Sequence, residues 1–464
     1  MDSLTTFRSE IDGIPFDDDA ATLRIKSRDF FWFSPILRSE LEGRVADIVV
    51  RPRDKRDLLR VAAAAAKARL PLTVRGGGTG NYGQAVPLAG GVVLDMTGLD
   101  RLVRVKPGVA RIEAGATMLE IDRALKPTGW ELRFHPSTRQ SATIGGFLAG
   151  GAGGIGSCTW GQISDRGAVL SAEVVTLEEE PRILELSGDD VMRVVHAYGV
   201  NGIITEVEMP LAPIQPWAER IYAFPSLAQA AAFGKALTAA DAIARKLVSI
   251  HDARIPPLIR RLSPLVPEGA AMAIVMVSEP QAAVTTARAA GHGGECVFER
   301  NAEETDAAAF SAIGAMPPLY EYTWNHTTLH AMRADPSFTY LQVRYPPDND
   351  LAVIEAAARA FPDEFITHLE FQRRFGRVGA SALPLVRYSG RERLFAMIEK
   401  LDAIGASVSN PHTWRLDGAG WKRIDAPQPD FKAAADPYGL MNPGKLVDWP
   451  APETAVKIPV APAV

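Results

Sequence analysis

The chain has 464 residues, of which 47% are hydrophobic and 23% are charged, so it can fill about two or three packed domains and is too apolar for wholesale disorder. The formal net charge is -5 and no Lys/Arg-rich cluster stands out, which excludes DNA and RNA as partners. No apolar run reaches the roughly 18 residues of a membrane span, and the acidic start over residues 1–19 lacks the pattern of a secretory signal. We therefore expect a cytoplasmic protein without a transmembrane segment, in which Cys158 and Cys296 are reduced thiols.

The first half of the sequence predicts an α+β domain over residues 40–212. It opens as a βαβ unit, with a strand over 46–50, a helix that Asp54 caps, and a strand over 71–75. Further strands and one helix follow in a glycine-rich setting. We expect strands over 92–96, 102–105, 110–114, 172–177 and 202–209 and a helix over 117–125.

Three prolines mark the expected end of this domain, because proline cannot continue a helix or a central strand: Pro210, Pro213 and Pro216. A second domain over 213–405 then repeats a strand and helix rhythm that is typical of a ferredoxin-like sheet covered by helices. Its expected strands lie over 221–224, 271–277, 340–345, 365–371 and 382–388, and its clearest helices over 351–360 and 391–404. Residues 406–450 form a closing segment, and residues 451–464 are predicted to be a disordered tail.

The first chemical signal is a glycine loop over residues 75–83, directly after a predicted strand. Glycine lets successive backbone N–H groups converge on phosphate oxygens. Gly78, Gly80 and Gly83 match the GxGxxG spacing, but a strand follows the loop where a Rossmann site requires a helix. A Walker loop is also excluded, because no Gly-Lys-Ser/Thr closes the run.

A second, longer glycine-rich stretch runs over residues 136–161. So many glycines are costly in ordinary packed structure, and flexible linkers seldom carry the interspersed apolar residues Ile144, Phe147 and Trp160. The stretch therefore predicts a close ligand.

Both glycine loops, the strand Gly202–Val207 and the ending Asn442–Lys445 resemble the vanillyl-alcohol oxidase and p-cresol methylhydroxylase (PCMH-type) family of FAD-binding proteins. The resemblance covers residues 40–212 and the closing segment. It implies an α+β fold, in which a two-part PCMH-type FAD-binding domain carries a ferredoxin-like cap domain inserted before the C-terminal segment. The residues that it implicates in FAD binding are Arg75, Gly76, Gly77, Gly78, Thr79, Gly80, Asn81, Pro136, Ser137, Thr143, Gly145, Gly146, Gly151, Trp160, Gly161, Gly202, Ile204, Asn442 and Lys445.

Many relatives in this family bind FAD covalently through a histidine of the first loop, but Thr79 stands at the corresponding place. Cys158 does not match the position of the family's linking cysteine either. We therefore expect non-covalent FAD.

The family implies an FAD-dependent oxidoreductase that removes a hydride from a CH–OH carbon, which needs a group to take the hydroxyl proton. His326 is the first candidate for this catalytic role, within a polar aromatic segment over 320–328. Further candidates are His368 and Glu370 on the polar face of the predicted strand 365–371, together with Tyr345, Arg373, Arg344 and the His412 segment. Arg373 or Arg344 could clamp a carboxylate, because a guanidinium pairs with it bidentately.

The first loop most resembles the glycolate oxidase and D-lactate dehydrogenase branch, which implies a 2-hydroxy acid substrate. That branch commonly carries metal-linked Gly-Asp-Gly-Asn-x-His and Gly-Glu-His-Gly segments, which this sequence lacks, so no metal is expected. Sugars and phenolic or benzylic alcohols stay open as substrates.

Two other activities are compatible with the resemblance. Some members of this fold join lipid fragments, but the expected His-rich run is absent. A flavoprotein subunit could pass electrons to a partner protein, in which case the partner must carry any iron-sulfur cluster, because two cysteines cannot hold one. Oxygen, a quinone or a partner protein are the possible acceptors, and a homodimer is left open.

Overall fold

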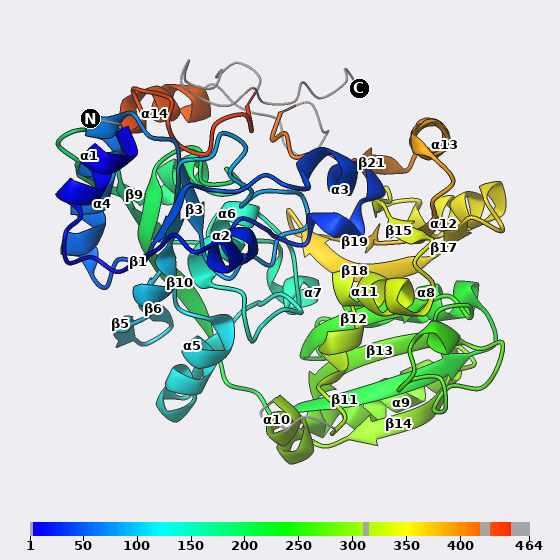
Figure 1. The fold of residues 1–464 in the computed structure, drawn as a ribbon. Helices are drawn as coiled ribbons and strands as arrows, with labels where there is room; N and C mark the ends of the chain where they lie inside the picture. Colours follow the sequence, from blue (N-terminus) through cyan, green and yellow to red (C-terminus); the bar gives the residue numbers. More distant parts are fainter. Residues whose placement is uncertain (1–2, 310–314, 418–426, 447–464) are drawn as a thin grey trace.

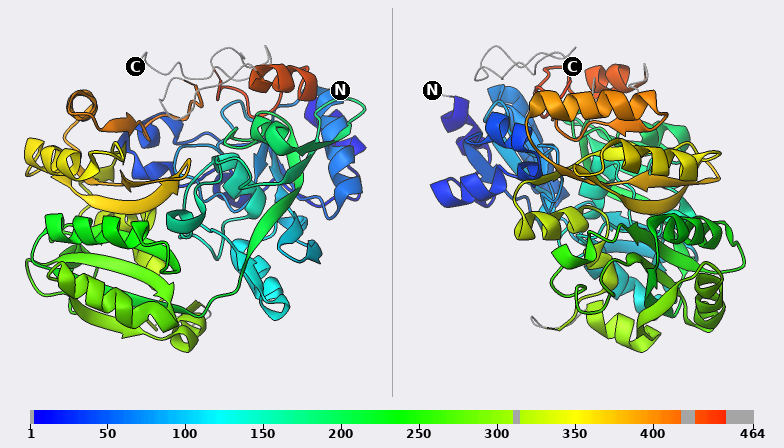
Figure 2. Two further views of the ribbon diagram at one scale, coloured as in Figure 1. Left: turned by 180° about the vertical axis from the view of Figure 1, so that it is seen from behind. Right: turned by 90° about the vertical axis from the view of Figure 1, so that its right-hand side faces the viewer.

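The computed structural model describes residues 3–309, 315–417 and 427–446, and the predicted tail lies outside them. They form two lobes side by side (Figures 1 and 2). The first lobe contains residues up to Pro213 and the C-terminal helix α14 (Pro427–Ala435), which contacts residues 188–193 of that lobe. The second lobe extends from Trp217 to Ser409.

The first lobe begins with a four-stranded sheet in the order β1-β2-β4-β3. β2, β3 and β4 are parallel, as expected of a βαβ unit, and α4 crosses between β2 and β3. Asp54 caps α4 by accepting a hydrogen bond from Asp57 N at 2.8 Å, and the helix buries Leu58, Val61 and its alanines. The elements are β1 (Phe16–Asp17), β2 (Ile48–Val50), α4 (Lys55–Ala68), β3 (Leu72–Arg75) and β4 (Val92–Asp95).

A second sheet in this lobe is antiparallel, in the order β5-β6-β10-β8-β9, with β7 paired to β10. The long central strand β10 runs through Pro210 to Pro213, where the sequence predicted a break. Pairing with β8 ends at Glu208, so neither proline has to donate a hydrogen bond to that neighbour. The strands are β5 (Leu102–Lys106), β6 (Val109–Glu113), β7 (Trp130–Leu132), β8 (Ser171–Val175), β9 (Ile183–Ser187) and β10 (Ile203–Pro213).

The remaining helices of this lobe are short and lie around the two sheets (Figure 1). α5 lies where a helix was predicted over 117–125, and the side chains of Thr117 and Thr143 cap α5 and α6. They are α1 (Ser3–Glu10), α2 (Ala20–Lys26), α3 (Pro35–Leu41), α5 (Met118–Leu125), α6 (Ile144–Gly150) and α7 (Ser157–Trp160).

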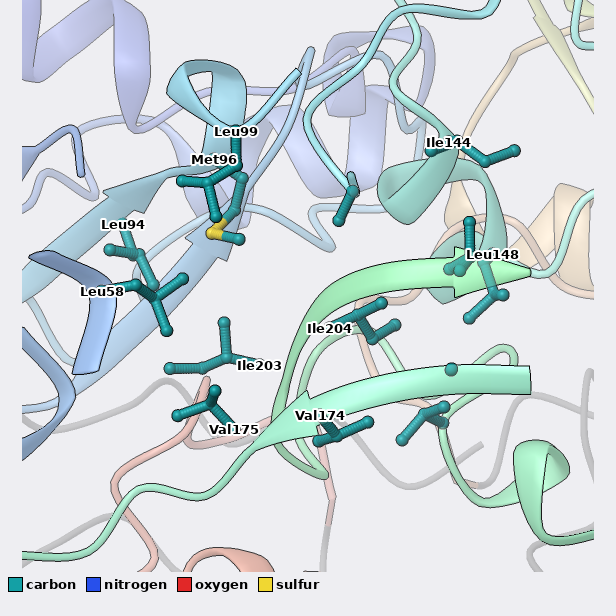
Figure 3. Packing of buried hydrophobic residues seen from close by; sticks show 14 of the residues in the cluster. Leu58, Leu94, Met96, Leu99, Ile144, Leu148, Val174, Val175, Ile203 and Ile204 are labelled. Atoms are coloured by element: carbon teal, nitrogen blue, oxygen red, sulfur yellow. The ribbon is translucent and has the colours of Figure 1, made fainter. Parts of the chain in front are cut away.

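One hydrophobic core joins both sheets (Figure 3). Leu58 of α4 and Leu94 of β4 pack in the same cluster as Ile203 of β10 and Val175 of β8. Burying each such side chain stabilises the fold by about 1.5–3 kcal/mol. The two sheets are therefore parts of one folding unit.

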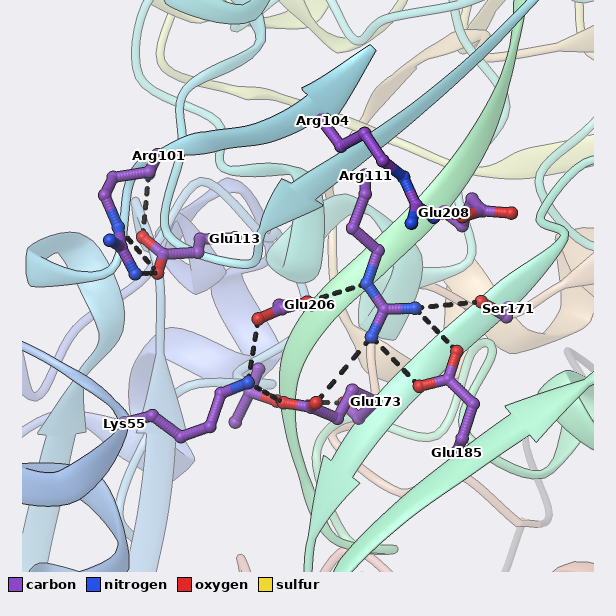
Figure 4. Close-up of polar contacts among 11 residues, drawn as sticks. Lys55, Arg101, Arg104, Arg111, Glu113, Ser171, Glu173, Glu185, Glu206 and Glu208 are labelled. Atoms are coloured by element: carbon purple, nitrogen blue, oxygen red, sulfur yellow. Dashed lines mark hydrogen bonds and ion pairs between the residues drawn. The ribbon is translucent and has the colours of Figure 1, made fainter. Parts of the chain in front are cut away.

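An ionic network also ties α4 to the second sheet (Figure 4). Lys55 Nζ lies 2.6 Å from Glu173 and 2.8 Å from Glu206, and Arg111 bonds Glu206 at 2.7 Å and Glu185 at 2.6 Å. Burial raises the pKa of Glu206, but its bonds to Lys55 and Arg111 outweigh burial and lower it overall. Glu206 therefore stays charged, and the network connects α4 to the second sheet.

The second lobe contains an eight-stranded antiparallel sheet in the order β14-β11-β13-β12-β18-β19-β16-β21 and a small sheet in the order β15-β20-β17. The large sheet consists of β11 (Trp217–Phe224), β12 (Arg245–His251), β13 (Ala271–Ser278), β14 (Glu295–Arg300), β16 (Gln342–Arg344), β18 (His368–Arg374), β19 (Arg377–Ala382) and β21 (Ser407–Ser409). The small one consists of β15 (Phe338–Tyr340), β17 (Phe365–Ile366) and β20 (Leu385–Arg387). Strand β12 was not predicted.

Helices cover one face of the large sheet, and a second hydrophobic core lies between these helices and the sheet. The opposite face of the sheet is covered by the segment 255–266 and by residues 319–331, which include the start of α11. The helices are α8 (Leu227–Ala239), α9 (Ala282–Gly291), α10 (Ala302–Ala309), α11 (Asn325–Ala334), α12 (Asp350–Ala360) and α13 (Arg391–Ala403). Among the described residues, no helix is both long and apolar enough to cross a membrane.

The strand predicted over residues 365–371 is divided between the two sheets. Residues 365–366 pair in the small sheet, and β18 begins at His368 in the large one. Covering both faces of β18 buries His368, Glu370 and Gln372 to at least 96%. The strand face that was predicted to be polar is thus mostly buried in the protein interior.

Candidate functional site

A cavity of about 530 Å³ lies between the two lobes, within the size range of small-molecule sites. We call it the interlobe cavity. Its walls come from four segments of chain: the first glycine loop, the second glycine-rich stretch, the residues before β10, and the edge of the second lobe around β16, β18 and the start of α11.

The first wall is the loop after β3, from Gly76 to Asn81, and it offers backbone donors. In the described part of the chain, none of the amides of residues 77–81 donates to a protein acceptor. The loop is fixed from behind, because Phe30 N donates to Gly80 O at 2.7 Å. Five consecutive amides that line a cavity without protein acceptors fit an anionic ligand with several oxygens, such as a diphosphate.

Glycine is required in this loop because a neighbouring loop lies against it. A Cβ at Gly77 would lie 1.9 Å from Ser141 O, and one at Gly76 would lie 2.0 Å from Thr143 Oγ1. Arg75 does not line the cavity: its guanidinium lies beneath Gly78 and donates to Arg28 O. Arg75 therefore supports the loop from below.

The second wall comes from residues 136–154, including Pro136, Ser137, Thr143, Gly145, Gly146 and Gly151. Its amides at Ile144 and Gly145 already bond Ala116 O and Ala114 O at 2.9 Å, so this wall supplies shape more than donors. A Cβ at Gly151 would meet His196 at 2.2 Å, and one at Gly153 would meet Trp324 at 2.7 Å. The glycines of this stretch thus admit large side chains from the other walls.

The third wall was only partly predicted. Gly202 and Ile204 line the cavity as expected, together with Met192 and Val195, which make this end apolar. His196 and Tyr198 were missed, although both line the cavity and both have positive φ, at 53° and 51°. Such backbone conformations cost about 1–3 kcal/mol each and occur where the surrounding structure enforces them.

The C-terminal segment supports the first and third walls through hydrogen bonds to their backbone on the side away from the cavity. Asn442 Nδ2 donates to Gln84 O at 2.8 Å and to Tyr198 O at 2.7 Å. Lys445 Nζ donates to Gly83 O at 2.6 Å and to Val86 O at 3.1 Å. Both residues were expected beside a flavin ring, but neither lines the cavity. Burial lowers the pKa of Lys445, and the nearby Asp29 carboxylate, which does line the cavity, partly offsets this.

The fourth wall belongs to the second lobe and carries two arginines. Arg344 of β16 and Arg374 at the end of β18 both line the cavity. Burial, reinforced by repulsion from Arg374, lowers the pKa of Arg344 to about 10, so its guanidinium remains charged at neutral pH. Among the described residues, Arg344 has no carboxylate partner. Gln342, which had not been predicted, lies in the same wall, as does Gln372, which belongs to the polar strand face that was expected to look into a pocket.

His326 also lines the cavity, at the start of α11. Its Nδ1 lies 2.8 Å from Glu321 Oε2, an ion pair when the imidazole is protonated. A histidine oriented through Nδ1 by a carboxylate presents Nε2 to its other side and is suited to take up a proton there. The neighbouring Asn325 Nδ2 donates to Asn81 Oδ1 at 3.1 Å and so connects the two lobes.

The structure places the other candidate catalytic residues outside the cavity lining. Arg373 points away from Arg374 and pairs with the exposed Asp241, because neighbouring residues of a strand face opposite ways. Tyr345 packs in the core beneath the helices, where burial raises its pKa. His368 and Glu370 lie one layer behind the wall, and His412 bonds Ser34 Oγ and Tyr340 O in the interior.

Trp160 and Gly161, expected at the cofactor, are also outside the lining. Trp160 is 40% exposed and stacks with Arg133, whose guanidinium lies 4.7 Å from the ring centre. Gly161 lies against Asp165. Their segment, α7, packs on β12 and β18 and so belongs to the contact between lobes.

Comparison with known proteins identifies the first lobe. Residues 46–185 match the family model of the FAD binding domain. D-2-hydroxyglutarate dehydrogenase of Escherichia coli (strain K12) is 36% identical over 152 residues, covering 30% of this chain and 14% of that protein. Glycolate oxidase subunit GlcD of the same organism is 30% identical over 184 residues, covering 38% of this chain and 36% of that protein. The chain thus matches well under two thirds of the length of either relative.

Solved structures extend the likeness to the whole fold. An alkyldihydroxyacetonephosphate synthase superposes with a TM-score of 0.70 at 15% identity, covering 94% of this chain and 85% of that one. The 4-ethylphenol oxidase of Gulosibacter chungangensis gives a TM-score of 0.66 at 15% identity, covering 97% of both chains. The predicted PCMH-type fold is therefore confirmed, and FAD is the cofactor that the first lobe is built to bind.

The residues of the interlobe cavity fit this cofactor. The acceptor-free amides of residues 77–81 suit its diphosphate, and the apolar end at Met192, Val195 and Ile204 suits a flat ring. The charged wall of the second lobe lines the same cavity. The cavity thus combines backbone donors and an apolar surface from the first lobe with charged side chains from the second.

Proposed function

We propose that this chain is an FAD-dependent dehydrogenase or oxidase that removes a hydride from the CH–OH carbon of a small 2-hydroxy acid. The observation that carries the proposal is the composition of the second-lobe wall, in which two arginines and a carboxylate-paired histidine face the same cavity as the glycine loop. When bound, FAD supplies the flavin N5 that accepts the hydride. The relatives whose names refer to glycolate and 2-hydroxyglutarate favour the same substrate class.

In this proposal, Arg344 and Arg374 bind the carboxylate of the substrate. A guanidinium presents two parallel N–H donors that match a carboxylate, and such charge-assisted bonds are about twice as strong as neutral ones. Because both side chains are half-buried, the attraction is screened less than at an open surface. The carboxylate anchors the substrate and leaves its hydroxyl-bearing carbon to be oriented.

His326 takes the hydroxyl proton at Nε2, and Glu321 stabilises the imidazolium that forms. The 2.8 Å contact at Nδ1 fixes the ring orientation and leaves Nε2 as the nitrogen that takes up the proton. Uptake of a proton while the hydride leaves prevents charge from accumulating on the substrate oxygen. The oxidised product, a 2-oxo acid, carries neither the proton nor the hydride.

We further propose that the FAD is dissociable. Thr79 lines the cavity where many relatives have a linking histidine. Cys158 lies outside the lining, and burial raises its thiol pKa to about 11, so it is mostly protonated and a weak nucleophile. Neither residue offers a covalent bond to the ring.

A sugar or a phenolic or benzylic alcohol is the alternative substrate, and it would offer no carboxylate to the two arginines of the wall. The electron acceptor is proposed to be oxygen, a quinone or a partner redox protein, and the chain is proposed to act in the cytoplasm, as a monomer or homodimer. These assignments rest on the sequence and on the relatives.

The test is an absorbance spectrum of the purified protein before and after acid precipitation, followed by anaerobic titration with 2-hydroxy acids, sugars and phenolic alcohols. We expect flavin bands that leave with the supernatant and that bleach with one or more 2-hydroxy acids. A protein that neither contains nor takes up FAD would refute the proposal. Bleaching only by uncharged alcohols would refute the substrate class and retain the cofactor.

A further inference from the structure

Trp324 has an unusual backbone conformation at the edge of the cavity. Its φ is 53° and its ψ is -142°, a combination that residues other than glycine rarely adopt. It precedes α11, and its side chain, together with those of Asn325 and His326, lines the interlobe cavity. The backbone at this single residue therefore determines the direction in which three consecutive wall residues point.

A buried carboxyl group holds that backbone. Glu370 Oε1 accepts a hydrogen bond from Trp324 N at 2.7 Å, and Ser249 Oγ donates to the same oxygen at 2.9 Å. His368 Nε2 lies 3.0 Å from it. Glu370, Ser249 and His368 are all at least 99% buried, so no water competes for these bonds.

The layer behind Glu370 is buried and connects to α11 as well. The rings of His368 and His251 stack with centres 4.5 Å apart, and Thr327 Oγ1 lies 3.4 Å from His368 Nε2 and 3.3 Å from His251 Nε2. Thr327 Oγ1 also donates to Tyr322 O at 2.7 Å. Strands β12 and β18 thus hold the residues on both sides of Trp324.

We propose that Glu370 is a positioning residue: through the Trp324 amide it fixes the strained start of α11 and so aims Trp324, Asn325 and His326 at the cavity. The inference rests on the proposed function, because His326 is the group whose placement matters for proton transfer. It assigns Glu370 and His368 a role that differs from direct catalysis, since neither lines the cavity.

The nature of the required group can be tested by substitution. Burial raises the pKa of Glu370 to about 8, so at neutral pH a carbonyl-type oxygen accepts the Trp324 bond, and glutamine offers the same acceptor. Leucine has a similar volume and no acceptor. We therefore expect Glu370→Gln to behave like the wild type and Glu370→Leu to lose the fixed wall.

For FAD-loaded protein, we expect Glu370→Leu to lower kcat by about 10- to 100-fold, the loss that a misplacement near 1 Å causes, with KM for the substrate changed less than about threefold. KM is expected to hold because Arg344 lies on β16 and Arg374 at the end of β18, so neither belongs to the start of α11 that the substitution releases. Glu355→Gln, which removes an exposed pair with Arg359 on α12, is the control and should leave kcat unchanged. Equal losses in Glu370→Gln and Glu370→Leu, or no loss in either, would overturn the inference.

A second measurement is independent of turnover and of bound flavin. Hydrogen exchange of the peptide that contains Trp324 should be at least about tenfold faster in Glu370→Leu than in the wild type, because an opened amide exchanges freely. Glu370→Gln should exchange at the wild-type rate. If Glu370→Leu leaves this exchange unchanged, Glu370 does not hold Trp324, whatever the activity assay shows. If wild-type protein fails to bind FAD, the proposed function fails, while the exchange experiment still decides the positioning role.

A third experiment relieves the backbone strain at residue 324. In a Trp324→Gly background the positive φ costs little, so adding Glu370→Leu should lower kcat by less than about threefold further. A full additional loss in the double variant would show that Glu370 acts by another route and would contradict the inference.

Discussion

The two lobes build the same cavity in different ways. The first lobe contributes mainly backbone, from glycine loops whose amides and shape follow from local sequence. The second lobe contributes side chains, from strands and a helix start that tertiary packing aims. The glycine-loop walls of the first lobe can therefore be predicted from the sequence. The wall of the second lobe depends on which face of each strand is covered.

The largest effect should come from breaking the backbone wall. We expect Gly77→Ala to be purified without FAD, because its Cβ would lie 1.9 Å from Ser141 O and overpacking of this kind costs about 1–3 kcal/mol besides displacing the loop. Absorbance at the flavin bands and FAD titration measure this. Gly291→Ala is the matched control, since nothing lies within 4 Å of the added Cβ and its φ is not positive. Normal FAD content in Gly77→Ala would show that the loop does not require glycine for cofactor binding.

The next effect should come from the charged part of the side-chain wall. Each charged hydrogen bond contributes about 1.5–3 kcal/mol, so the double variant Arg344→Ala, Arg374→Ala should lower kcat/KM for a 2-hydroxy acid by about 10²- to 10⁴-fold. FAD content should be unchanged. Arg373→Ala is the matched control, since Arg373 neighbours Arg374 but pairs with Asp241 outside the cavity. A comparable loss in the control would place the clamp elsewhere.

A smaller loss is expected when the proton acceptor alone is removed. His326→Gln should reduce kcat by about 100-fold, the low end of general base catalysis, with little change in KM. Steady-state kinetics of the loaded protein give both constants. His330→Gln is the comparison, since His330 lies on the same helix but does not line the cavity. Activity that survives in His326→Gln and fails in His330→Gln would reverse the assignment.

The last effect is on stability rather than on binding or activity, and it depends on pH. The pKa of Glu370 is raised by burial from 4.5 to about 8, so the folded state keeps a proton that the unfolded state releases in between. Its contribution is therefore fully present below about pH 4.5 and is lost as the pH rises towards 8, by on the order of 4 kcal/mol. Urea unfolding at pH 5 and pH 8.5 should show this loss in the wild type and not in Glu370→Gln. Glu364→Gln serves as control, because Arg393 lowers the pKa of Glu364 and its contribution is constant over this range.

The comparison also explains what the sequence could and could not predict. The PCMH-type fold and FAD were predicted because four motifs, in order, resemble a known family, and the match of the first lobe and the solved structures agree with this. Residues of the loops 76–81 and 136–151, which were predicted to bind the cofactor, line the cavity. His196 and Tyr198 were missed, because the structure around them imposes their positive φ and no glycine marks it.

Side-chain roles in the second lobe were harder to predict for a physical reason. The alternation of polar and apolar residues over 365–371 distinguishes the two faces of the predicted strand. It does not reveal that residues 319–331 cover the polar face. His368 and Glu370 were therefore expected in a pocket and lie behind its wall. Arg344 and Arg373 were both expected as carboxylate clamps. Arg344 lies on the face of β16 that lines the cavity, whereas Arg373 lies on the other face of β18 and pairs with Asp241.

The most direct test of the account compares one substrate with and without its charge. Wild-type protein loaded with FAD is mixed anaerobically with a 2-hydroxy acid that bleaches it, and in parallel with the methyl ester of the same acid. The account predicts rapid loss of the flavin band with the acid and a rate at least about 100-fold lower with the ester, because only the carboxylate can bind Arg344 and Arg374. Equal bleaching by acid and ester would contradict the proposed role of the cavity's charged wall.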